Sequence, residues 1–593
     1  YLAHDGAGMT ICPYCPHHCD IADSGTGICG MYTAVNDDII ERFPDHWLMV
    51  TPVSVETIPF IHAFPQAKAL QISTIGCNLK CPGCVSEVLV RKPDDMGTGL
   101  QYTSANAIID EAEKHDCRGI LFCLNEPTVS LPSFLRVACL AKEKGMFVGC
   151  SSNAYFSEHT LNLLLPVLDM INIGLKGKDE KNLKACGIFD DGVVIQNIKK
   201  LVQAGVHVEI ALMHAKGQEN ELITQAQEIV SISDKIPIQV MRCMAFGDLG
   251  QEYEPSIPES EFLCDQLREF ASHVYLLNSP GTAYINTVCQ DCGNVLSSRE
   301  MYGPMGCRPV TLLDTGLCSC GYQVPLCGTA SPSRYEEEGM DGGYRPTRAL
   351  EFIQGIVACL GVDDPLCAPR LWKLYLAHGK ISSIHDRIQK IPSYYDIIRE
   401  VAEIVDKKDA GEELLSVMED MKTLVTDAVK GTSHPRVLYT MGYPIFSLNG
   451  GRFENQLVNV AGGDPVNRMI KRTGKPGINL SHDEVLLLNP DWICISGLFS
   501  LPKEECIAYC KTHNLMVPAI TENKVIELPP SWDFGSPRWI LGLMLLAQSF
   551  HPEKCSWNMD EVADQFYQRF YHVPYRSVQP TRSFIKASAK ISG

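Results

Sequence analysis

Three cysteines in one short loop, directly after a predicted buried strand, constrain this chain more than any other feature. They are Cys77, Cys81 and Cys84, in the pattern C-x3-C-x2-C, and the apolar run Ala69–Ile75 precedes them. Three thiolates in one loop can hold three irons of a four-iron cluster and leave the fourth iron without a protein ligand. A zinc knuckle is the alternative, but zinc takes four ligands and the neighbouring sequence supplies no fourth. The triad therefore predicts an open iron–sulfur site.

Half of the 26 cysteines in this 593-residue chain lie in three tight groups, separated by long stretches with scattered single cysteines. A high cysteine count indicates either disulfides outside the cell or thiolates on metals inside it. Tight groups favour metals, because disulfide scaffolds are usually small domains with cysteines spread along them. No secretory leader is visible in Tyr1–Thr10, and the sequence does not begin with Met, so a trimmed N-terminus stays open. We predict a reducing, oxygen-poor, cytoplasmic setting.

Charge and hydropathy argue against two classes of partner. The chain has 51 Lys and Arg residues against 70 Asp and Glu residues, a formal net charge of −19, and no long basic stripe. This charge would repel nucleic-acid phosphates. The longest apolar run, Trp539–Ala547, is much shorter than the ~20 residues that span a bilayer. We therefore predict no nucleic-acid partner and no membrane span.

Strands and helices alternate along the first half of the chain. The expected strands are Ala69–Ile75, Gly119–Cys123, Phe147–Ser151, Met170–Gly174, His207–Leu212 and Pro237–Arg242. The expected helices include Ala105–Lys114, Leu131–Lys144, His159–Leu165 and Val193–Ala204. Strands rich in β-branched residues that alternate with such helices indicate βα units and parallel strands. Six units predict an α/β fold with a partial (β/α)6-type barrel.

Composition divides the chain into five predicted segments. Two are Cys-rich and metal-binding, one is the barrel, one is mostly helical, and the last returns to βα alternation. In chain order they are residues 1–45 (Cys-rich), 46–285 (barrel), 286–345 (Cys-rich), 346–435 (helical) and 436–593 (α/β). The helical segment ends in a predicted long helix, Tyr394–Val429, with apolar residues at helical spacing. The last segment contains the predicted strands and closing helix Arg436–Met441, Trp492–Ser496, Leu515–Ala519 and Pro537–Phe550.

The triad loop and five further motifs resemble the radical SAM superfamily, whose members cleave S-adenosylmethionine (SAM). The motifs are Cys12-Pro-Tyr-Cys15-Pro-His-His-Cys19 with Cys29, Leu124-Asn-Glu-Pro-Thr128, Ser151-Ser-Asn-Ala-Tyr155, Leu175-Lys176-Gly177 and Cys289-Gln-Asp-Cys292-Gly293. Over residues 1 to about 330 they are similar to the branch that contains pyruvate formate-lyase activating enzymes and AmmeMemoRadiSam proteins. The resemblance implies a [4Fe-4S] cluster that binds SAM, a low-potential electron donor such as ferredoxin or flavodoxin, and a 5′-deoxyadenosyl radical.

The resemblance also assigns cofactor-binding residues around SAM. Asn125 and Glu126 occupy the position of the family's Gly-Gly-Glu element, where Glu126 would hold the methionine amino group. Asn153 and Lys176 follow the next two strands, where the family contacts ribose and carboxylate, and a cation suits the carboxylate. From the residues alone, a carboxylate at the carboxyl end of a barrel strand suits an ammonium. An ordinary turn and an exposed surface lysine are the alternatives.

Three positions depart from the family pattern. Gly83 stands where an aromatic residue usually precedes the last triad cysteine. Gly174 and Ser151 stand where the branch often has aspartate. The loss of two acids weakens the case for a bound monovalent cation and for an ordinary glycyl-radical activase.

Two further cysteine groups flank the barrel. Cys12, Cys15, Cys19 and Cys29 follow C-x2-C-x3-C-x9-C, and four thiolates are enough for a closed site. The second group supplies its ligands from a subset of Cys289, Cys292, Cys307, Cys318, Cys320 and Cys327. We expect one or two additional Fe–S clusters or zinc ions here, and spacing does not choose between the two. The remaining cysteines are interpreted as small buried hydrophobes.

Residues 436–575 resemble the second lobe of periplasmic binding proteins of the metal- and cobalamin-receptor type. The motifs are Asn455-Gln-Leu-Val-Asn-Val-Ala461-Gly462-Gly463, Ser481-His-Asp-Glu484, Leu488-Asn-Pro-Asp-Trp492, Leu528-Pro-Pro-Ser-Trp532 and His551-Pro-Glu553. The helix Tyr394–Val429 matches the spine that joins two lobes in that fold. Only about residues 346–392 remain for the first lobe, so we expect a reduced lobe or a barrel wall in its place. Open α/β sheets bind ligands beyond the carboxyl ends of their strands. The candidate ligand contacts are Tyr443, Phe446, Arg452 and Trp532.

Three functions follow from this combination. The first is a radical SAM enzyme that acts on a substrate held by the C-terminal domain, with a metallo- or tetrapyrrole-like cofactor as the candidate. The second is an activating enzyme that generates a radical on a partner protein. The third is a non-catalytic carrier whose clusters relay electrons or deliver metal. The complete triad, together with Glu126 and Lys176, makes the third the least favoured.

Overall fold

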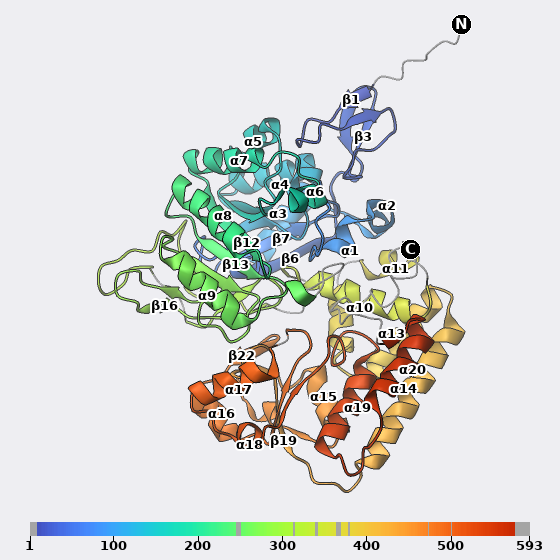
Figure 1. Ribbon diagram of the computed structural model, residues 1–593. Helices are drawn as coiled ribbons and strands as arrows, with labels where there is room; N and C mark the ends of the chain where they lie inside the picture. Colours follow the sequence, from blue (N-terminus) through green and yellow to red (C-terminus); the bar gives the residue numbers. More distant parts are fainter. Residues whose placement is uncertain are drawn as a thin grey trace.

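The structure is a computed structural model in which an upper α/β unit and a lower α/β unit pack on a layer of helices (Figure 1). It describes residues 9–244, 251–311, 313, 315–337, 342–362, 369–376, 380–472, 474–499 and 501–575. Within these ranges, no helix is both long enough and apolar enough to cross a membrane.

The upper unit is built on an eight-stranded sheet in the order β14-β13-β12-β11-β10-β9-β7-β6. Neighbouring strands from β7 to β14 are parallel, and β6 pairs with β7 in the antiparallel sense. The strands are β6 (Met49–Ser54), β7 (Lys68–Ser73), β9 (Gly119–Phe122), β10 (Phe147–Ser152), β11 (Met170–Leu175), β12 (His207–His214), β13 (Ile238–Arg242) and β14 (Val274–Leu277). The six predicted strands are confirmed, and β6 and β14 extend the sheet. The expected α/β class with a partial barrel is therefore correct.

Helices connect the parallel strands and cover one face of this sheet (Figure 1). They are α3 (Ala105–Lys114), α4 (Leu131–Glu143), α5 (Glu158–Leu164), α6 (Glu180–Cys186), α7 (Gly192–Gln203), α8 (Glu219–Ile232) and α9 (Ile257–Arg268). Local chemistry explains their starts: the Ser104 side chain accepts the Ala107 N–H at the N-cap of α3, and Ser256 with Glu259 forms a capping box before α9. The four predicted helices agree with α3, α4, α5 and α7 to within one residue at each end.

Short irregular segments flank the barrel, as the Gly- and Pro-rich composition predicts. The N-terminal strands are β1 (Met9–Ile11), β2 (Asp20–Ala22), β3 (Tyr32–Val35), β4 (Asp38–Glu41) and β5 (His46–Trp47). Near the triad lie α1 (Glu87–Val90), α2 (Pro93–Met96) and β8 (Gln101–Tyr102). After the barrel come β15 (Thr287–Val288), β16 (Val295–Ser297), β17 (Arg299–Met301) and β18 (Cys307–Pro309).

The described residues of the helical segment form five helices, and the predicted spine is wrong as a single element. The helices are α10 (Arg345–Cys359), α11 (Pro369–Tyr375), α12 (Lys380–Arg387), α13 (Ile391–Ile404) and α14 (Lys408–Ala428). The chain leaves α13 at Asp406, whose φ is +56°, and the Lys407 N–H donates to the Ala402 carbonyl at 2.7 Å. This left-handed cap ends the helix, after which α14 packs against α13. Apolar residues recur at helical spacing before the cap and again after it, which is why the sequence suggested one helix.

The lower unit is a second open sheet in the order β22-β20-β19-β23-β24, with β21 paired to β19. Its strands are β19 (Arg436–Thr440), β20 (Phe446–Leu448), β21 (Asp464–Pro465), β22 (Gly477–Asn479), β23 (Trp492–Ile495) and β24 (Val525–Glu527). Its helices are α15 (Phe453–Val460), α16 (His482–Leu488), α17 (Lys503–Thr512), α18 (Pro518–Thr521), α19 (Trp539–Phe550) and α20 (Met559–Tyr571). Two predicted strands and the closing helix are confirmed. The predicted strand Leu515–Ala519 is wrong, because Pro518 lacks an N–H and starts α18 instead.

Helix α10 lies at the centre of the molecule, between the two units (Figure 1). All of its residues except Arg348 are buried. Leu350 and Ile353 belong to a hydrophobic core that includes Met31 of the N-terminal segment and Trp539 of α19. The upper unit, the helical layer and the lower unit therefore share one continuous core.

Gly542 in α19 tests the packing of the lower unit. A Cβ at this position would lie 1.8 Å from the Trp532 carbonyl oxygen, which is backbone and cannot move aside cheaply. We expect Gly542→Ala to destabilise the protein by about 2–4 kcal/mol, measured as a lower midpoint in chemical denaturation followed by circular dichroism. Gly192→Ala at the start of α7 is the control, because its methyl would meet only the carboxylate end of Asp190. Equal midpoints for both variants would contradict the predicted contact.

Candidate active site

The triad loop leaves the carboxyl end of β7 and leads directly into α1. Gly83 has a φ of +66°, a left-handed conformation that disfavours larger side chains. This explains why glycine rather than an aromatic residue precedes Cys84. The Arg91 guanidinium donates to the Cys81 carbonyl at 2.7 Å, and the Glu87 N–H donates to the Cys84 carbonyl at 3.1 Å. Residues that follow the triad in the sequence therefore hold the backbone of the loop in place.

The surroundings of the triad raise the pKa of all three thiols. Burial, and next the negative charge of Glu126, raise the pKa of Cys77 well above its usual range. Burial raises the pKa of Cys84 to about 11. A hydrogen bond with Cys186 is the main cause of the raised pKa of Cys81. A metal that binds these thiolates must displace their protons, so binding and proton release are coupled.

Cys186, at the end of α6, is a neighbour of the triad that the sequence did not reveal. Its side chain hydrogen-bonds with Cys81, and its carbonyl accepts the Lys80 N–H at 2.8 Å. No motif links it to a loop more than 100 residues away, and we had interpreted it as a packing residue. In the part of the chain that the structure describes, no three of these four sulfurs lie within 4.8 Å of one another. The arrangement is therefore wider than a zinc ion requires.

Glu126 is a buried acid at the carboxyl end of β9. Its carboxylate accepts hydrogen bonds from Thr128 Oγ1 at 2.7 Å, from Ser152 Oγ at 2.9 Å and from the Asn153 N–H at 2.8 Å. Burial raises its pKa, and these hydrogen bonds act in the opposite direction. A buried carboxylate of this kind gains from a cationic ligand partner, because charge in a low-dielectric site is costly when unpaired.

The two predicted asparagines hold the loops of the site together. Asn125 Oδ1 accepts the Thr74 N–H at 2.9 Å, and Asn125 Nδ2 donates to the Ile75 carbonyl at 2.9 Å, which ties β9 to the triad loop. Asn153 Nδ2 donates to Asn78 Oδ1 at 2.8 Å and lies 3.7 Å from Cys77 Sγ. Both amides are thus placed at the cluster site, Asn125 as a positioning residue and Asn153 in contact with a triad cysteine.

Lys176, after β11, lies among the sulfurs. Burial alone would lower its pKa, but the negative charges of Cys81, Cys186 and the other triad thiolates outweigh burial and raise it. A Cβ on Gly174 would lie 3.1 Å from the Lys176 ammonium nitrogen. Ser151 donates to or accepts from the Tyr344 hydroxyl at 2.9 Å. Of the two positions where the branch often has aspartate, Gly174 therefore lies close to the Lys176 ammonium. The other, Ser151, contacts the turn before α10.

This donor set fits a [4Fe-4S] cluster with SAM. Cys77, Cys81 and Cys84 would hold three irons, and the fourth iron would stay free for the amino and carboxylate groups of SAM. Glu126 and Lys176 present opposite charges beside the sulfurs, which match the ammonium and the carboxylate of the cosubstrate. The four residues that the sequence assigned to SAM thus lie together at the carboxyl edge of the barrel.

The N-terminal cysteine group, defined as Cys12, Cys15, Cys19 and Cys29, lies beside this edge. Burial raises the pKa of Cys15 to about 12, and the charges of the other three cysteines add to the effect, so the four lie close to one another. Backbone N–H groups point at all four sulfurs: those of Tyr14, His17, Ile28 and Met31. Such donors stabilise bound thiolates.

The distal cysteine group, defined as Cys289, Cys292, Cys318 and Cys320, forms a compact cluster. The four sulfurs all lie within 4.8 Å of one another, and the described residues contain no other group of three or more metal-binding side chains so close together. The other two predicted candidates lie elsewhere: Cys307 in β18 contacts the Glu56 carbonyl, and Cys327 pairs with His62 and Phe64 through its backbone. The C-x-C pair, Cys318 and Cys320, belongs to the site.

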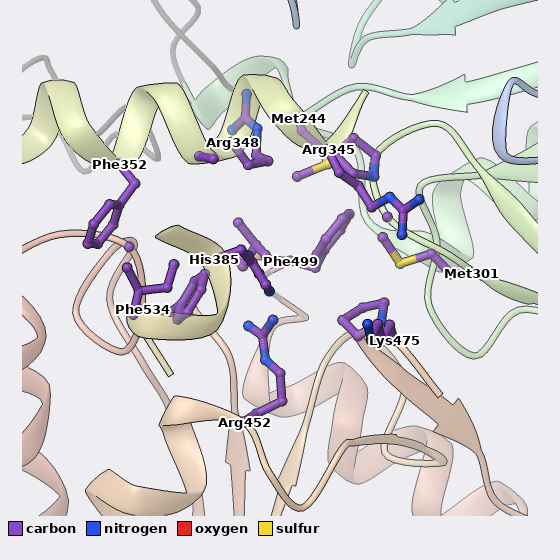
Figure 2. A pocket seen from close by; sticks show the side chains of 17 residues that line it. Met244, Met301, Arg345, Arg348, Phe352, His385, Arg452, Lys475, Phe499 and Phe534 are labelled. Carbon is purple, nitrogen blue, oxygen red and sulfur yellow. The ribbon is translucent and has the colours of Figure 1, made fainter. Parts of the chain in front are cut away.

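A cavity that is partly open to solvent lies between the two units. Met244 follows β13 and Phe499 follows β23, so the carboxyl ends of both parallel sheets face it. Figure 2 shows Arg452 pointing into this space from the lower unit, close to His385 and Phe534. Apolar walls with a few charged groups at strand carboxyl ends are typical of ligand sites in α/β proteins.

Four positive side chains line the cavity: Arg345, Arg348, Arg452 and Lys475. Arg345 and Arg452 are buried and paired with Glu337 and Glu454. In the described residues, Arg345 Nη1 is buried and has no hydrogen-bond partner. Burial, and next the charges of Arg452 and Arg345, lower the pKa of His385 to about 3, so its imidazole is neutral at physiological pH.

The other three predicted ligand contacts of the C-terminal domain do not line this cavity. The Tyr443 hydroxyl donates to Glu261 of α9 at 2.8 Å. Phe446 lies in the hydrophobic core, and Trp532 packs under α19 with its indole N–H 3.5 Å from the Tyr567 hydroxyl. Of the four predicted ligand contacts, Arg452 is the one that lines the cavity.

Two family models match the chain, one in each half. A model of the radical SAM superfamily matches residues 72–225, and a model of periplasmic binding proteins matches residues 380–532. An uncharacterized protein of Methanocaldococcus jannaschii is 24% identical over 324 residues, which are 53% of this chain and 95% of that protein. The chain therefore joins a radical SAM domain to a periplasmic-binding-protein-type domain, and it is a radical SAM enzyme.

Solved structures that are similar to part of this chain include solute-binding proteins. The periplasmic solute binding protein of Veillonella parvula has 18% identity and a TM-score of 0.29, with 34% of this chain and 64% of that chain covered. The molybdate-binding protein MolA of Haemophilus influenzae has 22% identity and a TM-score of 0.28, with 31% and 57% covered. Helicobacter pylori CeuE with Ni(II) has 18% identity and a TM-score of 0.29, with 32% and 62% covered. The chain thus spans less than two thirds of each of these proteins.

Glu126→Gln tests the assignment of the SAM ammonium partner. The substitution keeps an oxygen for Thr128 and Ser152 but removes the charge that faces the cosubstrate. We expect SAM affinity to fall by about 10- to 100-fold, the equivalent of one charge-assisted hydrogen bond. Anaerobic equilibrium dialysis with labelled SAM would measure this, with Glu113→Gln on the exposed surface of α3 as the control. Unchanged affinity with an intact cluster would contradict the assignment.

Proposed function

We propose that this radical SAM enzyme acts on a small anionic ligand bound in the cavity between the barrel and the C-terminal domain. The observation that carries the proposal is the position of the cavity, which lies at the carboxyl ends of both parallel sheets. Active sites of barrels and crevices of open α/β sheets both lie at this edge. The turn before α10 joins this space to the barrel mouth, because the Tyr344 hydroxyl contacts Ser151 of β10 and the next residue, Arg345, lines the cavity.

The residues of the barrel position SAM and exclude water from it. Glu126 and Lys176 bind the charged ends of the methionine moiety, and Asn125 holds the triad loop against β9. When bound and reduced, the cluster supplies one electron that cleaves SAM to methionine and a 5′-deoxyadenosyl radical. Tyr344 lies inside the barrel mouth, where its hydroxyl contacts Ser151 and its backbone neighbour Gly343 pairs with Gln71. This turn therefore lies where the barrel mouth meets the cavity.

The side chains of the cavity indicate the chemistry of the ligand. Arg452 lies 4.3 Å above the Phe534 ring centroid and pairs with Glu454 through two hydrogen bonds. Guanidinium groups beside aromatic rings suit a planar, anionic ligand with an apolar body. A metal chelate or a tetrapyrrole-like cofactor with carboxylate groups has this character, and the neutral imidazole of His385 could ligate its metal.

The cellular setting forms part of the same proposal. We place the barrel in the branch of pyruvate formate-lyase activating enzymes and AmmeMemoRadiSam proteins, on the motifs quoted above. The protein would work in an oxygen-poor cytoplasm, where ferredoxin or flavodoxin supplies the electron. A small-molecule product would support this function, whereas a radical on a partner protein would favour the alternative of an activating enzyme.

SAM cleavage can be tested without knowledge of the substrate. Protein purified anaerobically, reconstituted with iron and sulfide and reduced in the presence of SAM should release 5′-deoxyadenosine, measured by liquid chromatography and mass spectrometry. Cys84→Ala should abolish the release, because the triad then lacks a cluster ligand. Absence of 5′-deoxyadenosine from wild-type protein with an intact cluster would sink the proposal. A Cys77→Ala variant with full biological activity would point to the non-catalytic carrier.

Arg452→Met combined with Glu454→Gln tests the cavity. The double variant removes the charge that would bind a carboxylate and leaves no unpaired buried acid behind. We expect the affinity for protoporphyrin IX, a probe with two carboxylates, to fall about 10- to 100-fold, measured by quenching of tryptophan fluorescence. SAM cleavage should be unaffected. The exposed pair Arg472 and Glu484, changed in the same way, is the control, and equal affinities in both variants would contradict the site.

A further inference from the structure

The two four-cysteine groups differ in the spacing of their sulfurs. In the distal cysteine group, Cys289 Sγ lies 3.4 Å from Cys320 Sγ, and Cys292 Sγ lies 3.5 Å from Cys318 Sγ. These distances are too long for disulfides, whose sulfurs are about 2.05 Å apart. Four thiolates around a zinc ion, with Zn–S bonds of about 2.3 Å, are about 3.8 Å apart at the corners of a tetrahedron. The distal cysteine group therefore has the dimensions of a site for a single ion.

The N-terminal cysteine group is wider. Over the residues that the structure describes, no three of its sulfurs lie within 4.8 Å of one another, although the four share one small segment and each faces a backbone N–H. The triad, too, has no three sulfurs within this distance of one another in the described part of the chain. In an iron–sulfur cluster the thiolates bind different irons of an extended core, so they are not gathered around one ion. The N-terminal cysteine group and the triad therefore both lack the compact, single-ion spacing of the distal group.

The N-terminal cysteine group also contacts the loops that carry the SAM site. His17 Nε2 lies 2.8 Å from the carbonyl of Asn78, the residue after Cys77. A Cβ on Gly76, the residue before Cys77, would lie 2.6 Å from Met31 Cγ and 3.5 Å from the Cys29 carbonyl. Short paths of bonds and contacts thus run from two cysteines of this group to both sides of Cys77.

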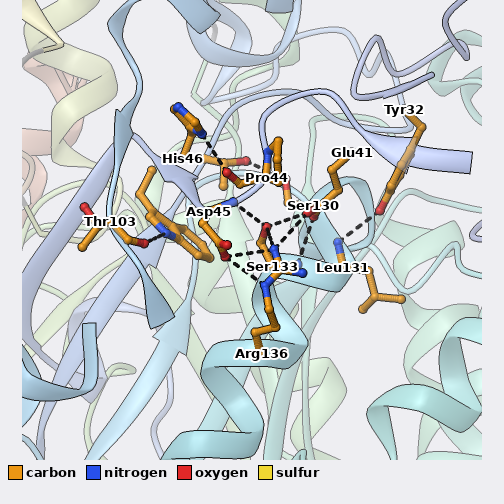
Figure 3. A network of polar contacts seen from close by, with 12 residues as sticks. Tyr32, Glu41, Pro44, Asp45, His46, Thr103, Ser130, Leu131, Ser133 and Arg136 are labelled. Atoms are coloured by element: carbon orange, nitrogen blue, oxygen red, sulfur yellow. Dashed lines mark hydrogen bonds and ion pairs between the residues drawn. The ribbon is translucent and has the colours of Figure 1, made fainter. Parts of the chain in front are cut away.

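A network of buried polar contacts fixes this placement (Figure 3). The Tyr32 hydroxyl donates to the Thr128 carbonyl at 2.8 Å and accepts the Leu131 N–H at 3.1 Å, in the loop that follows Glu126. Glu41 accepts the N–H and the hydroxyl of Ser133 at the start of α4, at 3.1 and 2.6 Å. A carboxylate is stabilised at a helix N-terminus. The segment is therefore held rigidly against the cluster site, as electron transfer requires.

The distal cysteine group lies at the opposite edge of the barrel sheet. Tyr322, two residues after Cys320, contacts His273 Nε2 at 3.2 Å through its hydroxyl. His273 immediately precedes β14, so it marks the amino edge, whereas the triad follows the carboxyl end of β7. A strand of five residues spans about 16 Å. The distal cysteine group and the triad lie at opposite ends of the strands, so at least this distance separates them along the strand direction.

We propose that the N-terminal cysteine group holds a redox-active iron–sulfur cluster that relays electrons to the SAM-binding cluster, and that the distal cysteine group holds a structural zinc ion. One electron enters the relay from a reduced flavodoxin- or ferredoxin-type protein, and one electron leaves it for the SAM-binding cluster. No bond is formed or broken at the relay. The relay rests on the enzyme's SAM chemistry, whereas the assignment of the two metals is independent of it.

Metal analysis of anaerobically purified full-length protein tests the assignment. A variant with alanine at Cys77, Cys81 and Cys84 should retain about two to four iron atoms per chain and one zinc. Adding Cys12→Ala and Cys15→Ala should remove this iron and leave the zinc. Cys289→Ala with Cys292→Ala should remove the zinc and leave the iron. Two zinc ions per chain in the triad variant would overturn the proposal, as would iron that is lost with the distal cysteines.

The choice of reductant tests the relay. Cys12→Ala with Cys15→Ala, in a chain with an intact triad, should release 5′-deoxyadenosine several-fold more slowly than wild type when reduced flavodoxin is the donor. Titanium(III) citrate, a small donor that reaches the SAM-binding cluster directly, should restore the wild-type rate. Cys139→Ala, an exposed cysteine of α4, is the control. Equal rates with flavodoxin would overturn the relay, and so would equal losses with both donors, which indicate a structural role. A wild-type protein that cleaves no SAM would instead contradict the proposed function.

Discussion

The burial of α10 between the barrel and the C-terminal domain is the interaction on which the rest of the structure depends. Its residues other than Arg348 are buried, and its apolar side chains join a core that extends into both units. Burial of apolar surface is the main favourable contribution to folding. The charged residues of the helix have partners: buried Arg345 pairs with Glu337, and half-buried Arg348 pairs with buried Glu351. Because an unpaired buried charge is costly, these pairs also fix the position and rotation of the helix.

The position of α10 brings the triad loop and the cavity next to one helix, although the residues of the two sites are far apart in the sequence. On one side, the helix packs against α1, which follows the triad loop, and the turn before it reaches Gln71 and Ser151 inside the barrel. On the other side, Ala349 and Phe352 form part of the cavity wall. A chain with an isolated barrel and an isolated binding domain would have no such wall. The shared helix is the physical reason to connect SAM chemistry with a bound ligand.

The charged groups around the triad also affect one another. Glu126 and the triad thiols are buried, and their pKa values are raised by desolvation or, at Cys81, by a shared hydrogen bond. Lys176 provides the opposite charge, and its own pKa is raised by the same sulfurs. Each of these groups would be unfavourable alone in a low-dielectric site. Together, the buried acid, the buried base and the thiols place opposite charges close to one another at adjacent strand ends.

Local signals in the sequence determined the βα units and the cysteine triad, because apolar runs, N-caps and short cysteine spacings act within a few residues. The strand β6 escaped notice because it contains Pro52 and lies at the edge of the sheet, where proline is tolerated. The break at Asp406 escaped notice because its cap depends on backbone conformation rather than on a glycine. Tertiary structure alone decided which cysteines converge, why Cys186 lies beside Cys81, and which side chains line the cavity. Those contacts join residues that are distant in sequence, and only the packing of whole elements brings such residues together.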